Sequence, residues 1–111
     1  MAWNAGLDIL KFWRVAMVRS VRSDSPDLTT RQTALMLTVY LTEGPHTVRG
    51  LAKELNVSKP VITRALDNLG QKGLLKRKRD EKDKRNVLVQ RTTGGAVFLR
   101  DFSDLVEDAG K

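Results

Sequence analysis

The sequence contains no cysteine, which excludes a disulfide framework, a thiolate metal site and a thiol redox switch. Its single histidine, His46, has no second histidine or cysteine with which to build a metal centre. No apolar run approaches the roughly 20 residues that a membrane span requires. The first residues also lack the basic segment and cleavage site of a secretory signal. We therefore expect a cytoplasmic protein with no cofactor, no metal and no membrane partner.

Glycines are scattered rather than clustered, so no loop is built to cradle a nucleotide phosphate. Three acidic residues, Asp80, Glu81 and Asp83, lie close together, but their spacing differs from that of a calcium-binding EF-hand loop. Cations surround them in the sequence, so ion pairs in solvent are the better interpretation. The sequence thus indicates a protein that is not an enzyme.

Basic residues are concentrated in one part of the chain. The formal net charge is +7, and residues 72–91 hold nine basic and three acidic residues, a local charge of +6. Such a local excess is the electrostatic footprint of a polyanion partner. An acidic protein or an anionic lipid surface fits this footprint less specifically. RNA is less favoured than duplex DNA because the basic stretch lacks the aromatic side chains on which RNA bases often stack.

The segment from Ser58 to Lys72 has the apolar spacing of an amphipathic helix. Ser58 is placed to cap the first turn, Pro60 fits in that turn, and Gly73 follows as a C-cap candidate. One side of this helix is apolar: Val61, Ile62, Ala65, Leu66 and Leu69. The other side is polar: Ser58, Lys59, Thr63, Arg64, Asp67, Asn68, Gln71 and Lys72. Its cations, hydroxyls and amides can hydrogen-bond phosphates and base edges; an ordinary solvated face is the alternative.

Two more helices precede this segment. Thr29 and Gln32 form a capping-box pattern at the start of a helix that Gly44-Pro45 ends, and because this helix is apolar nearly all round we expect it in the core. An apolar stripe then predicts a helix over residues 48–55. The stripe consists of Val48, Leu51, Ala52 and Leu55. Asn56 and Val57 form the tight turn that follows, so the sequence predicts a helix-turn-helix whose second helix enters the major groove of DNA.

The pattern after Gly73 changes from helical to extended. Two strands are predicted at residues 74–79 and 87–91, joined by the polar loop Asp80–Asn86, and residues 46–48 are predicted to form a short strand or extended chain. A hairpin directly after a helix-turn-helix makes a winged helix. We therefore predict a mainly α protein with a small antiparallel β-wing, as a single winged helix-turn-helix DNA-binding domain over residues 1–111.

Apolar residues are in surplus on two predicted terminal helices, residues 3–22 and residues 94–108, the second of them capped by Thr92 or Thr93. On the first helix they could form ordinary core, a partner-binding face or, less favoured, a membrane-surface helix. We expect the two helices to join two copies in a homodimer, because a single small winged helix contacts few base pairs. The residues expected in this interface are Trp3, Leu7, Leu10, Trp13, Met17, Phe98, Phe102 and Leu105.

From residue 28 to about residue 99, the sequence resembles the multiple-antibiotic-resistance regulator (MarR) family of winged helix-turn-helix transcription factors. The segment LTTRQTALM is similar to the second helix of that family. The helix-turn-helix, wing and following helix start are matched by GPHTVRGLAKELNVSKPVITRALDNLGQKGLLKRKRDEKDKRNVLVQRTTGG. The family pattern Asp-x-Arg-Asp-x-Arg in the wing is here Asp80-Glu81-Lys82-Asp83-Lys84-Arg85, with Lys82 in place of the first arginine. Arg91 stands where the family usually has an apolar residue.

The resemblance implies that Arg85 reaches the minor groove, while Asp80 and Asp83 hold the wing by pairing with nearby cations. It implies a regulator of transcription that binds double-stranded DNA sequence-specifically, with the recognition helix in the major groove. The alternative is a winged helix that binds protein without specific DNA readout. The residues expected at the DNA are Ser58, Lys59, Pro60, Thr63, Arg64, Asn68, Lys82, Lys84 and Arg85. Whether a small-molecule effector is sensed is left open.

Overall fold

The computed structural model describes residues 7–111, and the chain divides into two compact units. The central unit comprises residues 28–96, and the terminal unit combines the described residues up to Asp27 with residues 97–111. This division separates the predicted helix-turn-helix and wing from the two predicted terminal helices. The assignment of residues 1–111 to a single domain stays a prediction. None of the helices within residues 7–111 has the length and apolarity that a membrane crossing requires.

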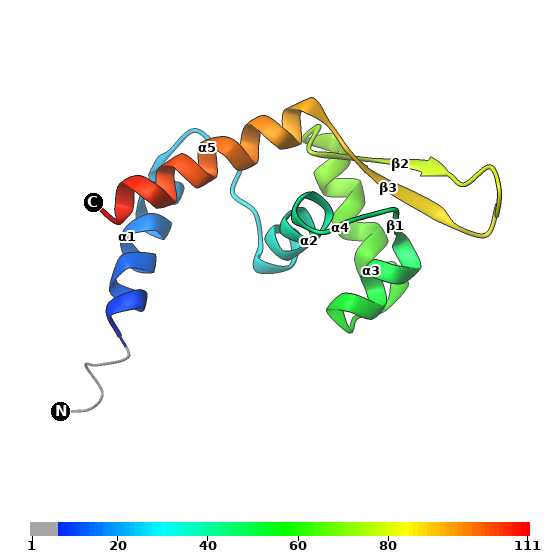
Figure 1. Ribbon diagram of the computed structural model, residues 1–111, viewed down its shortest axis with the longest axis horizontal. Helices are drawn as coiled ribbons and strands as arrows, with labels where there is room; N and C mark the ends of the chain where they lie inside the picture. The colour runs from blue at the N-terminus through cyan, green and yellow to red at the C-terminus, as the bar shows by residue number, and fades with distance from the viewer. Residues whose placement is uncertain (1–6) are drawn as a thin grey trace. The chain divides into compact units, whose positions relative to one another are not determined.

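The central unit contains three helices and a three-stranded antiparallel sheet in the order β1-β3-β2. Its elements are α2 (Thr30–Leu41), β1 (His46–Thr47), α3 (Val48–Leu55), α4 (Lys59–Gln71), β2 (Leu75–Arg79) and β3 (Val87–Arg91). The hairpin of β2 and β3 projects beyond the helices of this unit (Figure 1). These elements confirm the predicted winged helix-turn-helix, including the polar loop over residues 80–86.

Local sequence signals explain where the central helices begin and end. The predicted capping box is present, because the Gln32 backbone N–H donates to the Thr29 hydroxyl (3.1 Å) and the Thr29 N–H donates to the Gln32 side chain (2.9 Å). Asn56 adopts the left-handed conformation (φ 54°) in the turn between α3 and α4. Gly73 has φ 72°, a conformation in which a side chain is strained, and the chain reverses there from α4 into β2.

Several predicted boundaries and environments are wrong. The first helix, α1 (Asp8–Arg22), begins after Leu7, which is its N-cap rather than a residue inside it. The last helix, α5 (Thr93–Ala109), begins one residue earlier than predicted. The α2 helix is not buried all round, since Leu41 is 73% exposed and Leu37 is exposed as well. The buried residues of α2, which are Leu35, Met36 and Val39, share one side of the helix, and at 3.6 residues per turn the two exposed leucines lie on the other side.

The core of the central unit is continuous from the helices to the root of the wing. Its members come from α2, α3, α4, the turn into β2, and the strands β2 and β3: Leu35, Met36, Val39, Val48, Leu51, Ala52, Ile62, Ala65, Leu66, Leu69, Leu74, Leu75 and Val89. Each strand contributes one buried residue, Leu75 in β2 and Val89 in β3, and the rest of β2 is charged and exposed. The wing is therefore anchored by apolar burial, and its charge lies on β2 and the loop over residues 80–86, while β3 begins after that loop with the apolar Val87 and Leu88.

The hydroxyl of Tyr40 ties together three segments of the central unit. It lies 2.7 Å from the carbonyl oxygen of Leu74, to which it donates, and it accepts from the backbone N–H of Thr92 (2.9 Å). A Cβ atom built on Gly95 would lie 1.8 Å from this hydroxyl and 2.2 Å from the Leu74 carbonyl oxygen. Glycine at residue 95 is thus required by close approach, and it fixes where α5 starts against α2.

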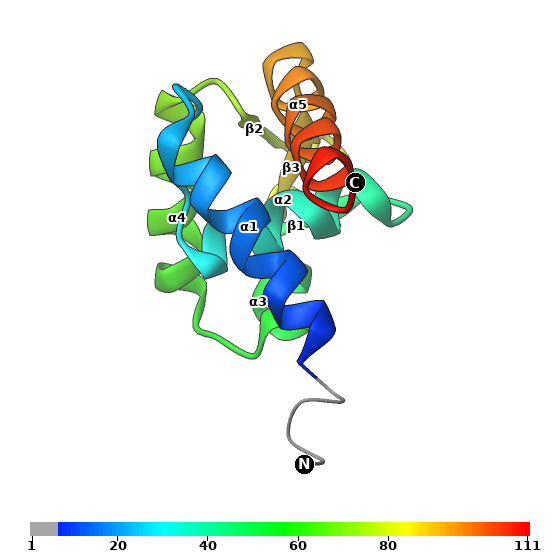
Figure 2. The ribbon, with the colours of Figure 1, turned by 90° about the vertical axis from the view of Figure 1, so that its left-hand side faces the viewer.

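The terminal unit contains α1 and residues 97–111 of α5, and each helix is unbroken (Figure 2). The ring of Trp13 meets that of Phe102 edge-on, with centroids 6.3 Å apart, and Phe98 stacks on Phe102 at 6.5 Å. These three aromatic residues therefore pack on one another within a single chain. Large apolar side chains nevertheless remain exposed in this unit: Ile9, Leu10, Trp13, Val18, Val21 and Val97.

The close approach at Gly95 predicts that alanine substitutions at Gly95 and Gly70 have different effects on the free energy of unfolding. Gly95→Ala should lower the free energy of unfolding by about 1–3 kcal/mol or more, because the new methyl group overlaps the Tyr40 hydroxyl. Gly70→Ala is the matched control: its Cβ meets nothing closer than 3.8 Å, so Ala should stabilise α4 by about 0.5–1 kcal/mol. Urea unfolding checks both, and equal stabilities for the two variants would contradict the packing described.

Candidate nucleic-acid interface

The exposed face of α4 holds most of the residues predicted at the DNA. Burial of Ile62, Leu66 and Leu69 turns the opposite face of the helix outward. Four of the predicted residues and Asp67 line one shallow hollow on that face: Lys59, Pro60, Thr63, Arg64 and Asp67. The structure therefore brings the predicted side chains of the first two turns together, and it adds Asp67, an acidic residue that is not among those predicted at the DNA.

Ser58 occupies the N-cap position of α4 by its backbone angles, but its hydroxyl makes no capping hydrogen bond, so the predicted cap is wrong. The reason is local: Pro60 lies at the second helical position and has no N–H, which removes one of the two donors that a capping side chain uses. The consequence is that the exposed Ser58 hydroxyl is free to bind another group.

Asn68 lies at the edge of the exposed face, turned toward α2. Its side-chain oxygen accepts from the Gln32 amide (3.1 Å) and from the Lys72 ammonium group (2.7 Å). Gln32 also closes the capping box of α2, so one side chain links the start of α2 to α4. The amide N–H groups of Asn68 remain the part of this residue that can donate to a ligand.

The wing loop is shaped by its two aspartates. Asp80 accepts from the backbone N–H of Lys82 (2.9 Å), and Asp83 accepts from the backbone N–H of Arg85 (3.1 Å) and from its guanidinium. Asp83 thus pairs with a cation as the resemblance implied. Asp80 instead accepts a hydrogen bond from the backbone and forms no ion pair among the described residues. The expectation that Asp80 pairs with a cation is therefore wrong. Lys82, Lys84 and Arg85 all point into solvent, with the Arg85 side chain 82% exposed.

The Arg85 side chain, followed by its backbone N–H, lowers the pKa of Asp83 below its usual value of 3.8, because both donors stabilise the charged carboxylate. The contact is therefore fully formed above the ordinary pKa of an aspartate, and it is lost as the pH falls through the lowered value. At neutral pH the tip of the wing is held by this pair, and Arg85 keeps a second guanidinium edge exposed.

The Arg91 side chain binds the C-terminal end of α2. Its guanidinium donates to the carbonyl oxygens of Val39 (2.9 Å) and Thr42 (3.2 Å), and it lies 5.9 Å from the centre of the Tyr40 ring. A cation at the C-terminus of a helix satisfies carbonyl groups that lack a helical partner. Arg91 is thus a structural residue at the root of the wing.

Two residues of this interface were missed from the sequence. Asp67 on α4 and Arg77 on β2 form an ion pair between this helix and the wing. Strand alternation in residues 75–79 could have indicated that Arg77 lies on the same side as the buried Leu75. No signal in the sequence pairs it with Asp67, because that contact depends on how the hairpin packs.

A family model described as the MarR family matches residues 28–87, which is more than half of the chain. The chain belongs to the MarR family. It is 45% identical over 56 residues to the multiple antibiotic resistance protein MarR of Escherichia coli, a match that covers 50% of this chain and 39% of that protein. It is 40% identical over 52 residues to the transcriptional repressor YetL of Bacillus subtilis, covering 47% of this chain and 31% of the relative.

Several solved structures share the fold. The S. aureus MepR–DNA complex superimposes with a TM-score of 0.71 at 26% identity, covering 77% of this chain and 69% of that one. Apo MarR from E. coli gives a TM-score of 0.65 at 35% identity, covering 76% and 62%. The chain spans at most 40% of the length of the curated relatives that it matches.

The Asp83–Arg85 pair gives a prediction about pH. In Arg85→Ala, the pKa of Asp83 should rise toward the ordinary aspartate value, because the largest stabilising donor is gone. Lys84→Ala is the matched control and should leave the Asp83 pKa unchanged, since Lys84 makes no hydrogen bond to that carboxylate among the described residues. NMR titration of the side-chain carboxyl measures both; the same Asp83 pKa in the wild type and Arg85→Ala would show that the pair does not form.

Proposed function

We propose that this chain is a transcriptional regulator that binds double-stranded DNA sequence-specifically and is not an enzyme. The observation that carries the proposal is the outward face of α4, on which hydroxyl, cationic and amide groups lie opposite a buried apolar face. The similar MepR structure is a DNA complex, and the similar curated protein YetL is named a transcriptional repressor. The predicted cytoplasmic location is part of this proposal, because a regulator of transcription must have access to the DNA that it binds.

The proposal assigns different parts of the surface to different parts of the duplex. Arg64 is the first candidate for a base edge, because its guanidinium can pair with two acceptors of guanine and it forms no ion pair among the described residues. Asn68 is the second candidate, through its amide N–H groups. Ser58, Lys59 and Thr63 position phosphates beside Pro60 at the start of the helix. At the wing, Lys82 and Lys84 contribute charge and Arg85 enters a narrow minor groove, where A·T-rich DNA concentrates negative potential.

Arg64→Ala tests the major-groove assignment. If Arg64 makes a bidentate guanine contact, the variant should lose about 1–3 kcal/mol of binding free energy on a specific duplex and relax the preference at one base step. Arg85→Ala is the comparison: it should weaken binding and reduce the preference for flanking A·T tracts, but keep the base preference at that step. Binding assays on specific and random duplexes separate the two. An equal loss of Arg64→Ala on both duplexes would make Arg64 a phosphate contact.

A two-fold symmetric homodimer is part of the proposal, with the terminal unit as its interface. Of the residues predicted there, Leu10 and Trp13 are exposed, whereas Leu7, Met17, Phe98, Phe102 and Leu105 are half-buried within the chain. Trp3 lies outside the described residues. The exposed apolar surface of α1 supports the interface, because a surface of this kind is normally covered by a partner.

Leu10→Glu tests the dimer. The wild type should sediment as a dimer at micromolar concentration, and Leu10→Glu should sediment as a monomer, because a charge replaces an exposed apolar side chain on α1. Lys11→Ala, a change at the neighbouring exposed residue, should leave the dimer intact. A wild-type monomer that binds DNA at one copy per site would defeat this part of the proposal.

A further inference from the structure

An acidic side chain lies in the middle of the face that the proposed function turns toward DNA. Asp67 follows Thr63 by four residues and Arg64 by three, so it shares their side of α4, and its side chain is 55% exposed. A carboxylate there repels the phosphates of an approaching duplex unless another group compensates its charge.

The compensating group is Arg77 on the edge strand β2. One terminal guanidinium nitrogen donates to Asp67 Oδ1, and the Arg77 side chain is 36% exposed. A guanidinium carries five N–H donors in a planar fork, and the bond to Asp67 is the one side-chain hydrogen bond that Arg77 makes within residues 7–111. Donors are therefore left over on a side chain whose orientation is already fixed.

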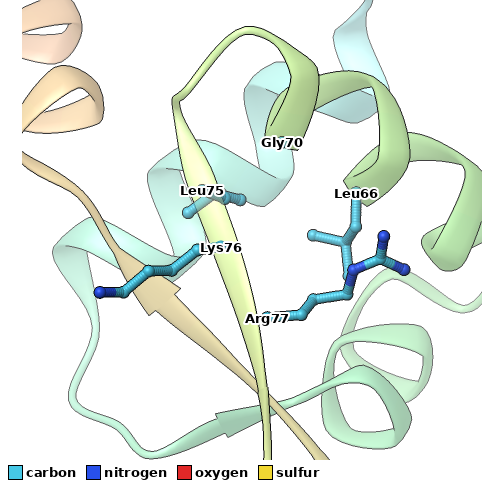
Figure 3. Close-up of a pocket in the computed structure, with 5 residues that line it drawn as sticks. All are labelled: Leu66, Gly70, Leu75, Lys76 and Arg77. Carbon is cyan, nitrogen blue, oxygen red and sulfur yellow. The ribbon is translucent and has the colours of Figure 1, made fainter.

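The space beside this guanidinium is open. A hollow of about 300 Å³ lies between α4 and β2, lined by Leu66, Gly70, Leu75, Lys76 and Arg77. Figure 3 shows the Arg77 side chain reaching from the strand toward α4 and the Lys76 side chain extending away on the other side of the strand. Gly70 adds no side chain to the hollow, and even a Cβ atom there would meet nothing closer than 3.8 Å.

We propose that Arg77 binds a phosphate of the DNA backbone at this hollow, between the recognition helix and the wing, and that Asp67 is the positioning residue that holds its guanidinium. This inference rests on the proposed function. Arginine presents two parallel donors to a phosphate, and a guanidinium held in place loses less side-chain entropy on binding than a free one. A phosphate contact of this kind fixes the position of the protein on the duplex without reading its sequence.

If Asp67 positions Arg77, removing Asp67 should change the DNA affinity in the direction opposite to the one expected from net charge alone. Removing the Asp67 carboxylate takes a negative charge from the DNA-facing surface, which by itself would strengthen binding. If Asp67 holds Arg77 in position, Asp67→Ala should instead weaken binding, by roughly twofold to tenfold. The effect should vanish once Arg77 is gone, because Asp67 then has nothing to position.

The experiment is a double-mutant cycle on duplex binding at several salt concentrations. Arg77→Ala should lower affinity equally on specific and random duplexes, and the slope of log affinity against log salt should become shallower by about 0.9, the value for one lost phosphate contact. Asp67→Ala should weaken binding, and the double variant should bind no more weakly than Arg77→Ala. Lys78→Ala is the matched control, because it removes one charge from the next residue, which alternates to the other face of β2. It should change the slope less than Arg77→Ala does.

All variants should remain folded, since an exposed ion pair contributes little to stability. If Arg77→Ala unfolds, Arg77→Gln takes its place in the cycle, because it keeps a long polar side chain. Tighter or unchanged binding by Asp67→Ala overturns the inference and leaves the proposed function standing. If the slope of log affinity against log salt is the same for Arg77→Ala and Lys78→Ala, the inference is also overturned and the proposed function still stands. A wild-type chain that binds no duplex overturns the proposed function, and this inference with it.

Discussion

The structure depends above all on the burial of one face of α4. Ile62 and Leu69 are fully buried and Leu66 is almost so, against side chains from α2, α3 and the root of the wing. Each such side chain contributes about 1.5–3 kcal/mol when it leaves water. Because these residues recur at three- and four-residue spacing, burying them also fixes the rotation of the helix about its axis. The polar face of α4 then points outward, and no additional interaction is needed to orient it.

The wing needs a second constraint, because a two-stranded hairpin alone is marginally stable in water. Its root is held by the buried Leu75 and Val89, by the Tyr40 hydroxyl and by Arg91 at the end of α2. Toward the recognition helix, the Asp67–Arg77 pair adds a polar contact across the gap. The charged loop can therefore project into solvent while its base stays fixed relative to α4.

Most of the architecture could be predicted from the sequence, because its signals are local. Apolar spacing located α3 and α4, a capping box located the start of α2, and the change to an extended pattern after Gly73 located the hairpin. Apart from the Ser58 cap, whose loss has a local cause, the errors at the candidate interface share one cause: each depends on which side chains tertiary packing brings together. The oxygen of Asn68 is bonded to Gln32, Arg91 caps α2, and Asp67 pairs with Arg77, and no periodicity in the chain links these residues.

The outward face of α4 and the wing are proposed to select a DNA sequence, and this can be measured by selecting bound sequences from a random duplex pool. If the proposal is correct, the wild-type protein should enrich a motif of two related half-sites whose centres lie about one helical turn, roughly 10 base pairs, apart. A pool that stays random after repeated selection, while an equally basic MarR-family regulator enriches its own motif under the same conditions, would contradict it.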